Sequence, residues 1–337
     1  MNTGGAMDFF SLYKDCRLCP RDCGVDRLAG ADGWCGEKAE LRLAFAGLHR
    51  GEEPPLSGKG GSGTVFVSGC NLGCAFCQNW QISGGGQSGG GITDRNGERR
   101  RRHLGRVVST DEFTAICLEL QKRGAENINI VTGSHAVPAI VQGLIAAKTA
   151  GLNIPVLWNS SGYENLASLE LLDGHIDTYM PDLKTLDSGL AARFFNAPDY
   201  PQTASRAILW MIQHRTRRQP DQVIIRHLIL PGYLESTRAV LRWFADNARG
   251  SALLSLMSQY TPIAETNKPG DNSPLGNSPG RFLNKREYDT VLGWLGEFGI
   301  EDGFCQELLT GSDWLPDFNR RNPFSSDLSV AVWHFMD

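Results

Sequence analysis

Short apolar runs alternate with amphipathic stretches along most of this chain. The runs are almost continuously hydrophobic, as expected of parallel strands that are buried on both faces. Strands are predicted at residues 64–68, 127–132, 154–158, 176–180, 223–230 and 252–257. The segments that follow have helical periodicity, at residues 109–124, 136–150, 163–172, 187–214, 235–247 and 285–298. The pattern therefore predicts an α/β fold made of six βα units.

The same pattern divides the chain into three parts. Residues 41–310 are predicted to form the βα domain, which begins with one further strand at residues 41–46. Residues 1–40 form a cysteine-rich extension, and residues 311–337 form a tail with so many aromatic side chains that it should be docked. Residues 84–106 are rich in glycine and arginine, which predicts a flexible insertion with too little apolar surface to order itself.

Three cysteines lie directly after the first strand of the βα repeat. Cys70, Cys74 and Cys77 are spaced C-x3-C-x2-C in a loop rich in glycine and asparagine. Thiolates this close together need a soft metal or an iron–sulfur cluster. A 4Fe–4S cluster needs four ligands, so three cysteines leave one iron open to a small chelating ligand. Zinc is the alternative, but a structural zinc site usually closes with a fourth protein ligand, and none follows closely.

This cysteine loop also bears on the fold. A doubly wound sheet and a barrel are both compatible with repeated βα units. Six units with a metal-binding loop after the first strand favour a partial (β/α)6 barrel, similar to a TIM barrel. In such a barrel the chemistry lies at the C-terminal ends of the strands.

A second group of four cysteines lies near the N-terminus. Cys16, Cys19, Cys23 and Cys35 are interleaved with glycine and proline, which indicates a metal-binding knuckle with little core of its own. Four thiols suit either a tetrahedral zinc ion or a second 4Fe–4S cluster, and the spacing does not separate the two. The remaining cysteines, Cys117 and Cys305, are interpreted as structural residues.

Composition and charge exclude several classes of protein. The chain has 33 Lys and Arg against 37 Asp and Glu, a net charge of −4 that gives no argument for nucleic-acid binding. No apolar run approaches the roughly 18 residues that span a membrane, and the N-terminus lacks the regions of a signal peptide. Most of the cysteines fall in two metal-type groups, which suits a reducing compartment. We therefore expect a cytoplasmic protein that binds neither membrane nor nucleic acid.

Polar residues follow the strands of the βα repeat. In a partial barrel these positions face the active site, so we expect a cavity that presents donors, acceptors and both charges. The segments are Thr132–His135, Asn159–Gly162, Met180–Lys184, Arg226–His227 and Ser258–Tyr260.

Five motifs give the chain a family resemblance. They are CRLCPRDCGVDRLAG…GWCGE, CNLGCAFCQNWQIS, WNSSGYE, MPDLK and IRHLILPG, in this order over roughly residues 16–310. The cysteine spacing, with Phe76 before the last cysteine, resembles the radical S-adenosylmethionine (SAM) superfamily. The whole set resembles its subgroup of pyruvate formate-lyase-activating enzymes. The resemblance implies a 4Fe–4S cluster and reductive cleavage of SAM to methionine and a 5′-deoxyadenosyl radical.

The resemblance also implies which residues bind the cofactors. Phe76 and Asn79 belong to the cluster motif, and Lys184, beside Asp182, pairs with the SAM carboxylate. The turn after the second strand holds the SAM amino group. In this chain the acidic residue of the family's Gly-Gly-Glu is replaced by His135. The remaining implied contacts are Gly133 and Ser134 in that turn, Asn159, Ser160, Met180 and Asp182 where the family can hold a monovalent cation, and Arg226 near the SAM methionine.

The resemblance favours one function and leaves others open. It implies activation of a glycyl radical enzyme by hydrogen abstraction, with an electron donor such as flavodoxin or ferredoxin. Radical modification of a small molecule or a peptide is the alternative within the same chemistry. A non-catalytic iron–sulfur electron-transfer protein is the rival of a different class. The polar strand ends disfavour that rival, because an electron carrier needs no cavity for a solute.

Overall fold

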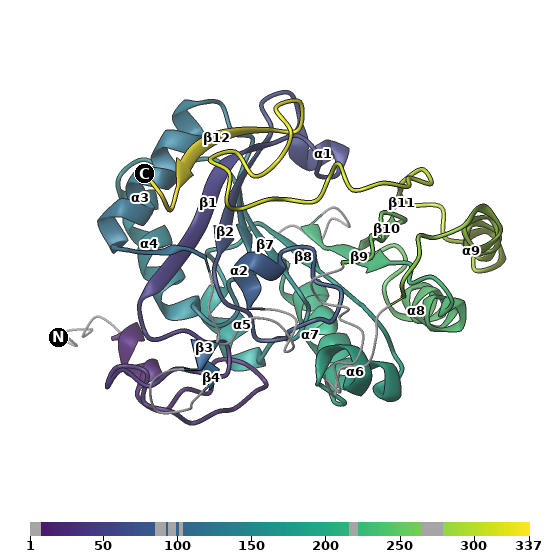
Figure 1. The fold of residues 1–337 in the computed structure, drawn as a ribbon, viewed down its shortest axis with the longest axis horizontal. Coiled ribbons are helices and arrows are strands. Elements are labelled where there is room, and N and C mark those ends of the chain that lie inside the picture. The colour runs from purple at the N-terminus through teal and green to yellow at the C-terminus, as the bar shows by residue number, and fades with distance from the viewer. Residues whose placement is uncertain (1–7, 85–91, 94–98, 101–103, 216–221, 264–278) are drawn as a thin grey trace.

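The chain has an α/β fold in which a mostly parallel sheet is covered by helices (Figure 1). The computed structural model describes residues 8–84, 92–93, 99–100, 104–215, 222–263 and 279–337. Its strands are β1 (Leu41–His49), β2 (Ser62–Val67), β3 (Ile92–Thr93), β4 (Arg99–Arg100), β5 (Arg106–Val108), β6 (Ile128–Val131), β7 (Val156–Ser160), β8 (Thr178–Pro181), β9 (Ile224–Leu228), β10 (Leu253–Met257), β11 (Gly303–Cys305) and β12 (Ser329–His334).

The helices lie mainly between these strands. A 3-10 helix, η1 (Phe9–Tyr13), precedes the sheet. The α-helices are α1 (Pro54–Ser57), α2 (Trp80–Ser83), α3 (Thr110–Lys122), α4 (Val137–Thr149), α5 (Leu166–Leu172), α6 (Ser188–Phe195), α7 (Tyr200–His214), α8 (Leu234–Asn247) and α9 (Lys285–Glu297). The predicted helices are thus confirmed, with boundaries that differ by a few residues.

The parallel strands are neighbours in the order in which they occur along the chain. β2, β6, β7 and β8 pair successively in parallel. Two parallel bridges, Tyr179 to Val223 and Asp182 to Arg226, continue the array from β8 to β9. β10 and β11 then follow in parallel. The predicted βα repeat is confirmed, and among the described strands the array stays open, with β11 at one end and the antiparallel β1 beyond β2 at the other.

Burial explains why the central strands were readable in the sequence. β2 and β6 are buried along their whole length, so both faces of these strands are covered.

Helix α3 is capped by Ser109, whose side chain accepts a hydrogen bond from the backbone N–H of Glu112 at 3.1 Å. Its apolar face is buried and includes Cys117, which is a core residue as predicted.

The aromatic tail is docked against the sheet. β12 runs antiparallel to β1, with His334 opposite Phe45. Phe318 is fully buried, and its ring meets that of Phe66 edge-on, with 5.4 Å between centroids. Phe324 packs against the rings of Phe45 and Phe66 at 6.1 and 5.6 Å. These rings bury large apolar area, which explains why the tail lies on the sheet.

The predicted insertion at 84–106 is described only in part. Residues 85–91, 94–98 and 101–103 lie outside the described residues. β3 pairs antiparallel with β4, and β5 pairs with β1. The carbonyls of Leu104 and Gly105 accept hydrogen bonds from Ser68 and Arg42 at 2.7 and 3.0 Å. The C-terminal end of the segment is thus held by hydrogen bonds and by pairing with the edge of β1, which composition does not reveal, and the flexibility of the insertion stays a prediction.

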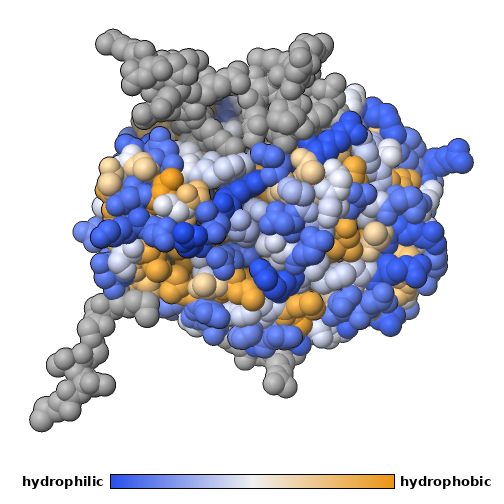
Figure 2. All heavy atoms as spheres, turned by 90° about the horizontal axis from the view of Figure 1, so that it is seen from below, coloured by the Kyte–Doolittle hydropathy of each residue, from blue (hydrophilic) through white to orange (hydrophobic). Residues whose placement is uncertain are grey.

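The surface seen from below is mostly hydrophilic, with small hydrophobic areas between the polar ones (Figure 2). Most large apolar side chains lie instead in one continuous core beneath the helices. Among the described residues, no helix combines the length and the apolarity that crossing a bilayer requires.

Candidate active site

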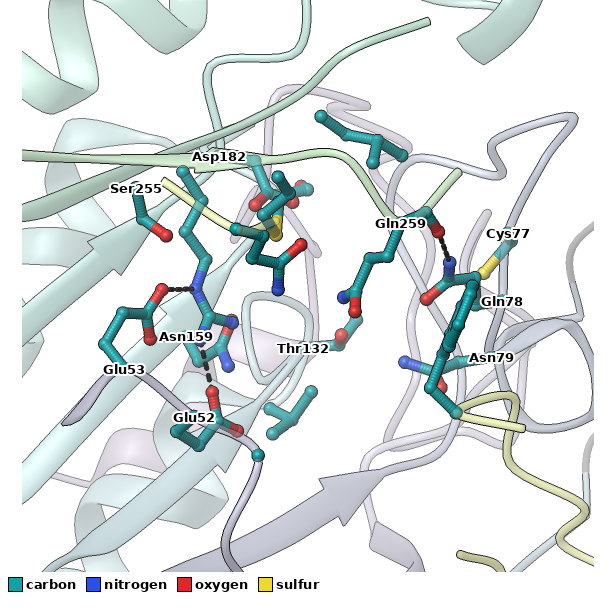
Figure 3. Close-up of a pocket in the computed structure, with 18 of the residues that line it drawn as sticks. Glu52, Glu53, Cys77, Gln78, Asn79, Thr132, Asn159, Asp182, Ser255 and Gln259 are labelled. Carbon is teal, nitrogen blue, oxygen red and sulfur yellow. Dashed lines mark hydrogen bonds and ion pairs between the residues drawn. The ribbon is translucent and has the colours of Figure 1, made fainter. Parts of the chain in front are cut away.

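A cavity of about 840 Å³ lies where the parallel strands end. The polar strand ends expected from the sequence meet there: Thr132, Asn159, Asp182, Arg226 and Gln259. Figure 3 shows Glu52 and Glu53 on one side of this space and Cys77, Gln78 and Asn79 on the other, with Thr132 between them. The cavity thus has a cysteine side and a carboxylate side.

The cysteine side is formed by the loop after β2. Cys70, Cys74 and Cys77 all line the cavity. The backbone N–H of Leu72 donates a hydrogen bond to the Cys70 sulfur at 3.3 Å, and the Ser83 hydroxyl lies 3.3 Å from the Cys77 sulfur. Polar hydrogens near sulfur stabilise a thiolate, so this donor set suits a thiolate-bound cluster.

Burial disfavours the thiolate forms of Cys74 and Cys77. It raises the pKa of Cys74 and Cys77, and the nearby charge of Lys184 lowers both pKa values only in part. Among the described residues, no three His, Cys, Asp or Glu side chains are placed so that they could hold a metal ion without rearranging. Loading a cluster therefore requires the thiols to lose their protons to the metal's charge.

Phe76 and Asn79, predicted in the cluster motif, also line the cavity. Phe76 is buried, with its ring 5.9 Å from those of Phe194, Phe195 and Tyr260. Asn79 is the N-cap residue of α2. The aromatic cluster around Phe76 fixes the loop between Cys74 and Cys77 from behind.

Asp182 and Lys184 form an ion pair at the cavity wall, with 2.5 Å between the Lys184 Nζ and the carboxylate. Burial alone would lower the pKa of Lys184, but Asp182 and the neighbouring Cys74 raise it. Lys184 therefore stays charged beside the cysteine loop. The Tyr200 hydroxyl accepts the Lys184 backbone N–H at 3.0 Å and lies 2.9 Å from the carbonyls of Ser161 and Asp182. Tyr200, which the sequence did not single out, fixes the backbone of this pair.

Asn159 and Ser160 line the cavity, but two other predicted contacts do not. Gly133 turns into the core, where an added Cβ would lie 2.6 Å from the Trp158 ring. The Ser134 hydroxyl hydrogen-bonds the buried carboxylate of Glu164 at 2.6 Å. Neither residue is among those that line the cavity. Thr132 occupies that place instead, with a left-handed φ of 63°.

The carboxylate side was not foreseen from the sequence. Arg226 makes a two-pronged ion pair with Glu53, at 2.8 Å from Nε and 2.5 Å from Nη2, and a further ion pair with Glu52. All three side chains are largely buried. Burial would raise the pKa of Glu53, but Arg226 outweighs it and lowers that pKa. The guanidinium of Arg226 is therefore engaged by protein carboxylates, and its contact with SAM stays a prediction.

Two C-terminal segments complete the wall. Trp314, Pro316, Phe324 and Leu328 from the tail line the cavity, as does Cys305 at the end of β11. Cys305 is exposed, unlike the buried Cys117, and its interpretation as a structural residue stays a prediction. A single cysteine has no partner whose spacing could indicate a site. Cys305 reaches the cavity because β11 pairs in parallel with β10.

The four N-terminal cysteines lie outside this cavity, behind the cysteine loop. Cys16, Cys19 and Cys35 are buried and Cys23 is partly exposed. The position where a Cβ on Gly69 would lie is 3.2 Å from the backbone oxygen of Cys35. The extension is thus in direct contact with the residue that precedes Cys70.

Comparisons with known proteins bear on this site. A family model described as "Radical SAM superfamily" matches residues 64–244. A protein of Methanocaldococcus jannaschii, uncharacterized protein MJ0674, is 29% identical over 252 residues, which cover 75% of this chain and 68% of that protein.

Solved structures show weaker likeness. A radical SAM methyltransferase from Sphaerobacter thermophilus has a TM-score of 0.49 and 16% identity, over 73% of this chain and 66% of its own. SuiB from Streptococcus suis, solved with its precursor peptide SuiA, has a TM-score of 0.47 and 14% identity over 71% of this chain. The match covers 46% of the SuiB chain, less than half its length.

Proposed function

This chain belongs to the radical SAM superfamily, and from that premise we propose that it is an enzyme that reductively cleaves SAM in the cavity described above. The observation that carries the proposal is that Cys70, Cys74 and Cys77 line one cavity together with the Asp182–Lys184 pair. Three thiols from one loop fit a 4Fe–4S cluster with one open iron. When bound, this cluster supplies the electron that breaks the C5′–sulfur bond of SAM, giving methionine and a 5′-deoxyadenosyl radical.

The residues of the chain would bind and orient SAM. Lys184 presents a fixed positive charge to the SAM carboxylate, next to the cysteine loop. The polar side chains at the ends of β7 and β8 face the same space and offer partners for ribose and ammonium. Treated as a partial (β/α)6 barrel, the open array β2–β10 gathers all of these groups at one end.

Product analysis tests this proposal directly. We expect the anaerobically reconstituted protein to convert SAM to 5′-deoxyadenosine and methionine when dithionite is added, and to produce neither without reductant. A fully loaded protein that yields no 5′-deoxyadenosine and shows no SAM binding by calorimetry would refute the enzyme and favour the electron-transfer protein.

For the substrate, we propose a small molecule or a peptide as the better candidate. The tail residues Trp314, Phe324 and Leu328 line the cavity and are held by the docked β12, which narrows the access that a loop of another protein would need. Activation of a glycyl radical enzyme rests on motif resemblance alone, since neither the family model nor the relatives reported above point to the activating enzymes. A doublet electron paramagnetic resonance (EPR) signal from a cognate glycyl radical enzyme would reverse this preference.

Replacing Lys184 with methionine should weaken SAM binding by roughly tenfold or more, because a charge-assisted hydrogen bond contributes about 1.5–3 kcal/mol. Calorimetric titration of SAM into the reconstituted protein measures the effect. Lys148→Met is the control, since that exposed lysine donates to the His175 carbonyl at 3.2 Å and is not among the residues that line the cavity. Equal affinity of Lys184→Met and the wild type would remove Lys184 from the binding site.

A further inference from the structure

Arg27 is a buried cation at the centre of the cysteine-rich extension. Only 1% of the surface of Arg27 is exposed to solvent. It donates to the Cys16 sulfur at 3.5 Å and to the carbonyls of His135 and Lys38 at 2.7 and 3.0 Å. It also lies 4.5 Å from the centroid of the Tyr13 ring. Glu37 is a buried carboxylate whose pKa burial raises to about 7, against the opposing charges of Arg42 and Arg27, and it makes its ion pair with Arg42 at 3.2 Å.

A buried guanidinium needs a compensating negative charge. The hydrogen-bond acceptors of Arg27 in the described structure are neutral carbonyls and a cysteine sulfur. Four cysteine thiolates around one metal centre would supply that charge, because they outweigh the positive charge of Zn²⁺ or of a 4Fe–4S core. The environment of Arg27 therefore fits an anionic metal centre.

Arg21 connects the same extension to the active-site loop. It lies between Cys19 and Cys23, and its guanidinium stacks on Trp34, 3.6 Å from the ring centroid. It donates to the carbonyls of Asn71 and Leu72 at 2.7 and 3.1 Å, and to those of Phe195 and Asn196 at 2.9 and 2.5 Å. Asn71 and Leu72 are two of the three residues between Cys70 and Cys74.

A second connection runs through Arg27. The carbonyl of His135 accepts from Arg27, and the His135 ring nitrogen Nε2 lies 2.8 Å from the carbonyl of Ser68. Ser68 precedes Cys70 by two residues. Both links reach backbone carbonyls of the loop that carries the three active-site cysteines, so the geometry of that loop depends on how the extension is folded.

We propose that Cys16, Cys19, Cys23 and Cys35 hold a second, thiolate-ligated metal centre, and that this centre fixes the active-site cysteine loop through the positioning residue Arg21. The ligand is a thiophilic metal, either one zinc ion or a 4Fe–4S cluster. The metal site stands independently of SAM chemistry, whereas the positioning role of Arg21 rests on the proposed function.

Metal analysis of the Cys70/Cys74/Cys77→Ala variant tests the site without the active-site cluster. After anaerobic reconstitution with iron, sulfide and zinc, we expect about four irons and four sulfides per chain, or about one zinc. Adding Cys16→Ala and Cys19→Ala should remove this metal. Neither metal at stoichiometric level in the first variant, or equal metal in both, would overturn the proposal, whether or not the wild type cleaves SAM.

Arg21→Ala tests the link. With both centres loaded, we expect SAM cleavage to fall between tenfold and a hundredfold, because small displacements of reacting groups have effects of about this size. The EPR signal of the reduced active-site cluster should also change its response to SAM. Arg17→Ala is the matched control, because Arg17 lies in the same loop but its side chain is 57% exposed and pairs only with surface acids.

Three outcomes separate the two ideas. Wild-type EPR and wild-type cleavage in a fully loaded Arg21→Ala protein would overturn the positioning role. Arg21→Lys keeps the positive charge but loses the planar guanidinium with its several donors. Recovery of the wild-type EPR response in this variant would also count against the positioning role of Arg21. If the wild type itself cleaves no SAM while the N-terminal metal is present, the proposed function fails and the metal site stands.

Discussion

Replacement of Cys70, Cys74 and Cys77 by alanine should lower reductive SAM cleavage by at least about a thousandfold, to the level of the uncatalysed reaction. The three thiols are the ligands that the cavity offers on its cysteine side, so their loss removes the iron that SAM would chelate. The fall of about four irons per chain relative to the wild type measures the loss of the cluster, and the yield of 5′-deoxyadenosine measures the loss of SAM cleavage.

Cys305→Ala is the matched control for this variant. Cys305 lines the same cavity but lies at the end of β11, away from the loop of the other three cysteines. Its replacement should leave iron content and SAM cleavage at the wild-type level. Undiminished cleavage in the triple variant would show that the active iron is bound elsewhere and would end the assignment of the site.

Replacement of Arg226 by methionine should lower the free energy of unfolding by about 3–5 kcal/mol at neutral pH. The guanidinium is the partner of two buried carboxylates, Glu52 and Glu53, and methionine fills its volume without its charge. Denaturant unfolding of the unloaded protein measures the change. Arg123→Met is the control, because its pair with Glu119 at 2.8 Å is exposed and should contribute less than about 1 kcal/mol.

The pH dependence gives this prediction a definite sign. In the wild type the pKa of Glu53 is lowered, so its pairing stabilises the fold above the unfolded pKa of about 4.3 and the benefit is lost as pH falls further. Without Arg226, burial should raise the pKa of Glu53 instead. Lowering the pH from 7 would then protonate the unpaired carboxylate in the variant. The difference in free energy of unfolding between the variant and the wild type should therefore become smaller. If the difference in free energy of unfolding does not depend on pH, the lost stability comes from packing and not from charge.

The sequence carried most of the fold where burial is continuous. β2 and β6 are buried at every position and β7 at all but one, so each of these strands contains a short cluster of apolar residues that is easily recognised. β11 and β12 were missed because most of their residues are exposed or only partly buried, and because both strands form by pairing with partners far along the chain. The hydrophobic pattern of a segment indicates how far that segment is buried. It does not indicate pairing with residues far along the chain, on which these two strands depend.

The site divides in the same way. The spacing of Cys70, Cys74 and Cys77 is itself chemical information, and the structure places all three at one cavity. Glu52 and Glu53 come from a loop rich in glycine and proline, where carboxylates are normally solvated, and only Arg226 reveals them as a buried group. Gly133 and Ser134 do not line the cavity, because an added Cβ at Gly133 would face Trp158 and the Ser134 hydroxyl bonds Glu164, so their contact with SAM stays a prediction.

The pairing of Phe45 with His334 also dictates when the protein can finish folding. During synthesis β1 is made early, and the strand that covers part of its outer edge follows only after every βα unit has emerged. An unpaired strand edge with apolar residues is a template for association with other chains. The βα units can form from neighbouring segments as they are synthesised. The outer edge of β1 stays partly unpaired until residues 329–334 have been made. Ribosome-bound or proteolysed chains that lack β12 should therefore be the species that chaperones retain.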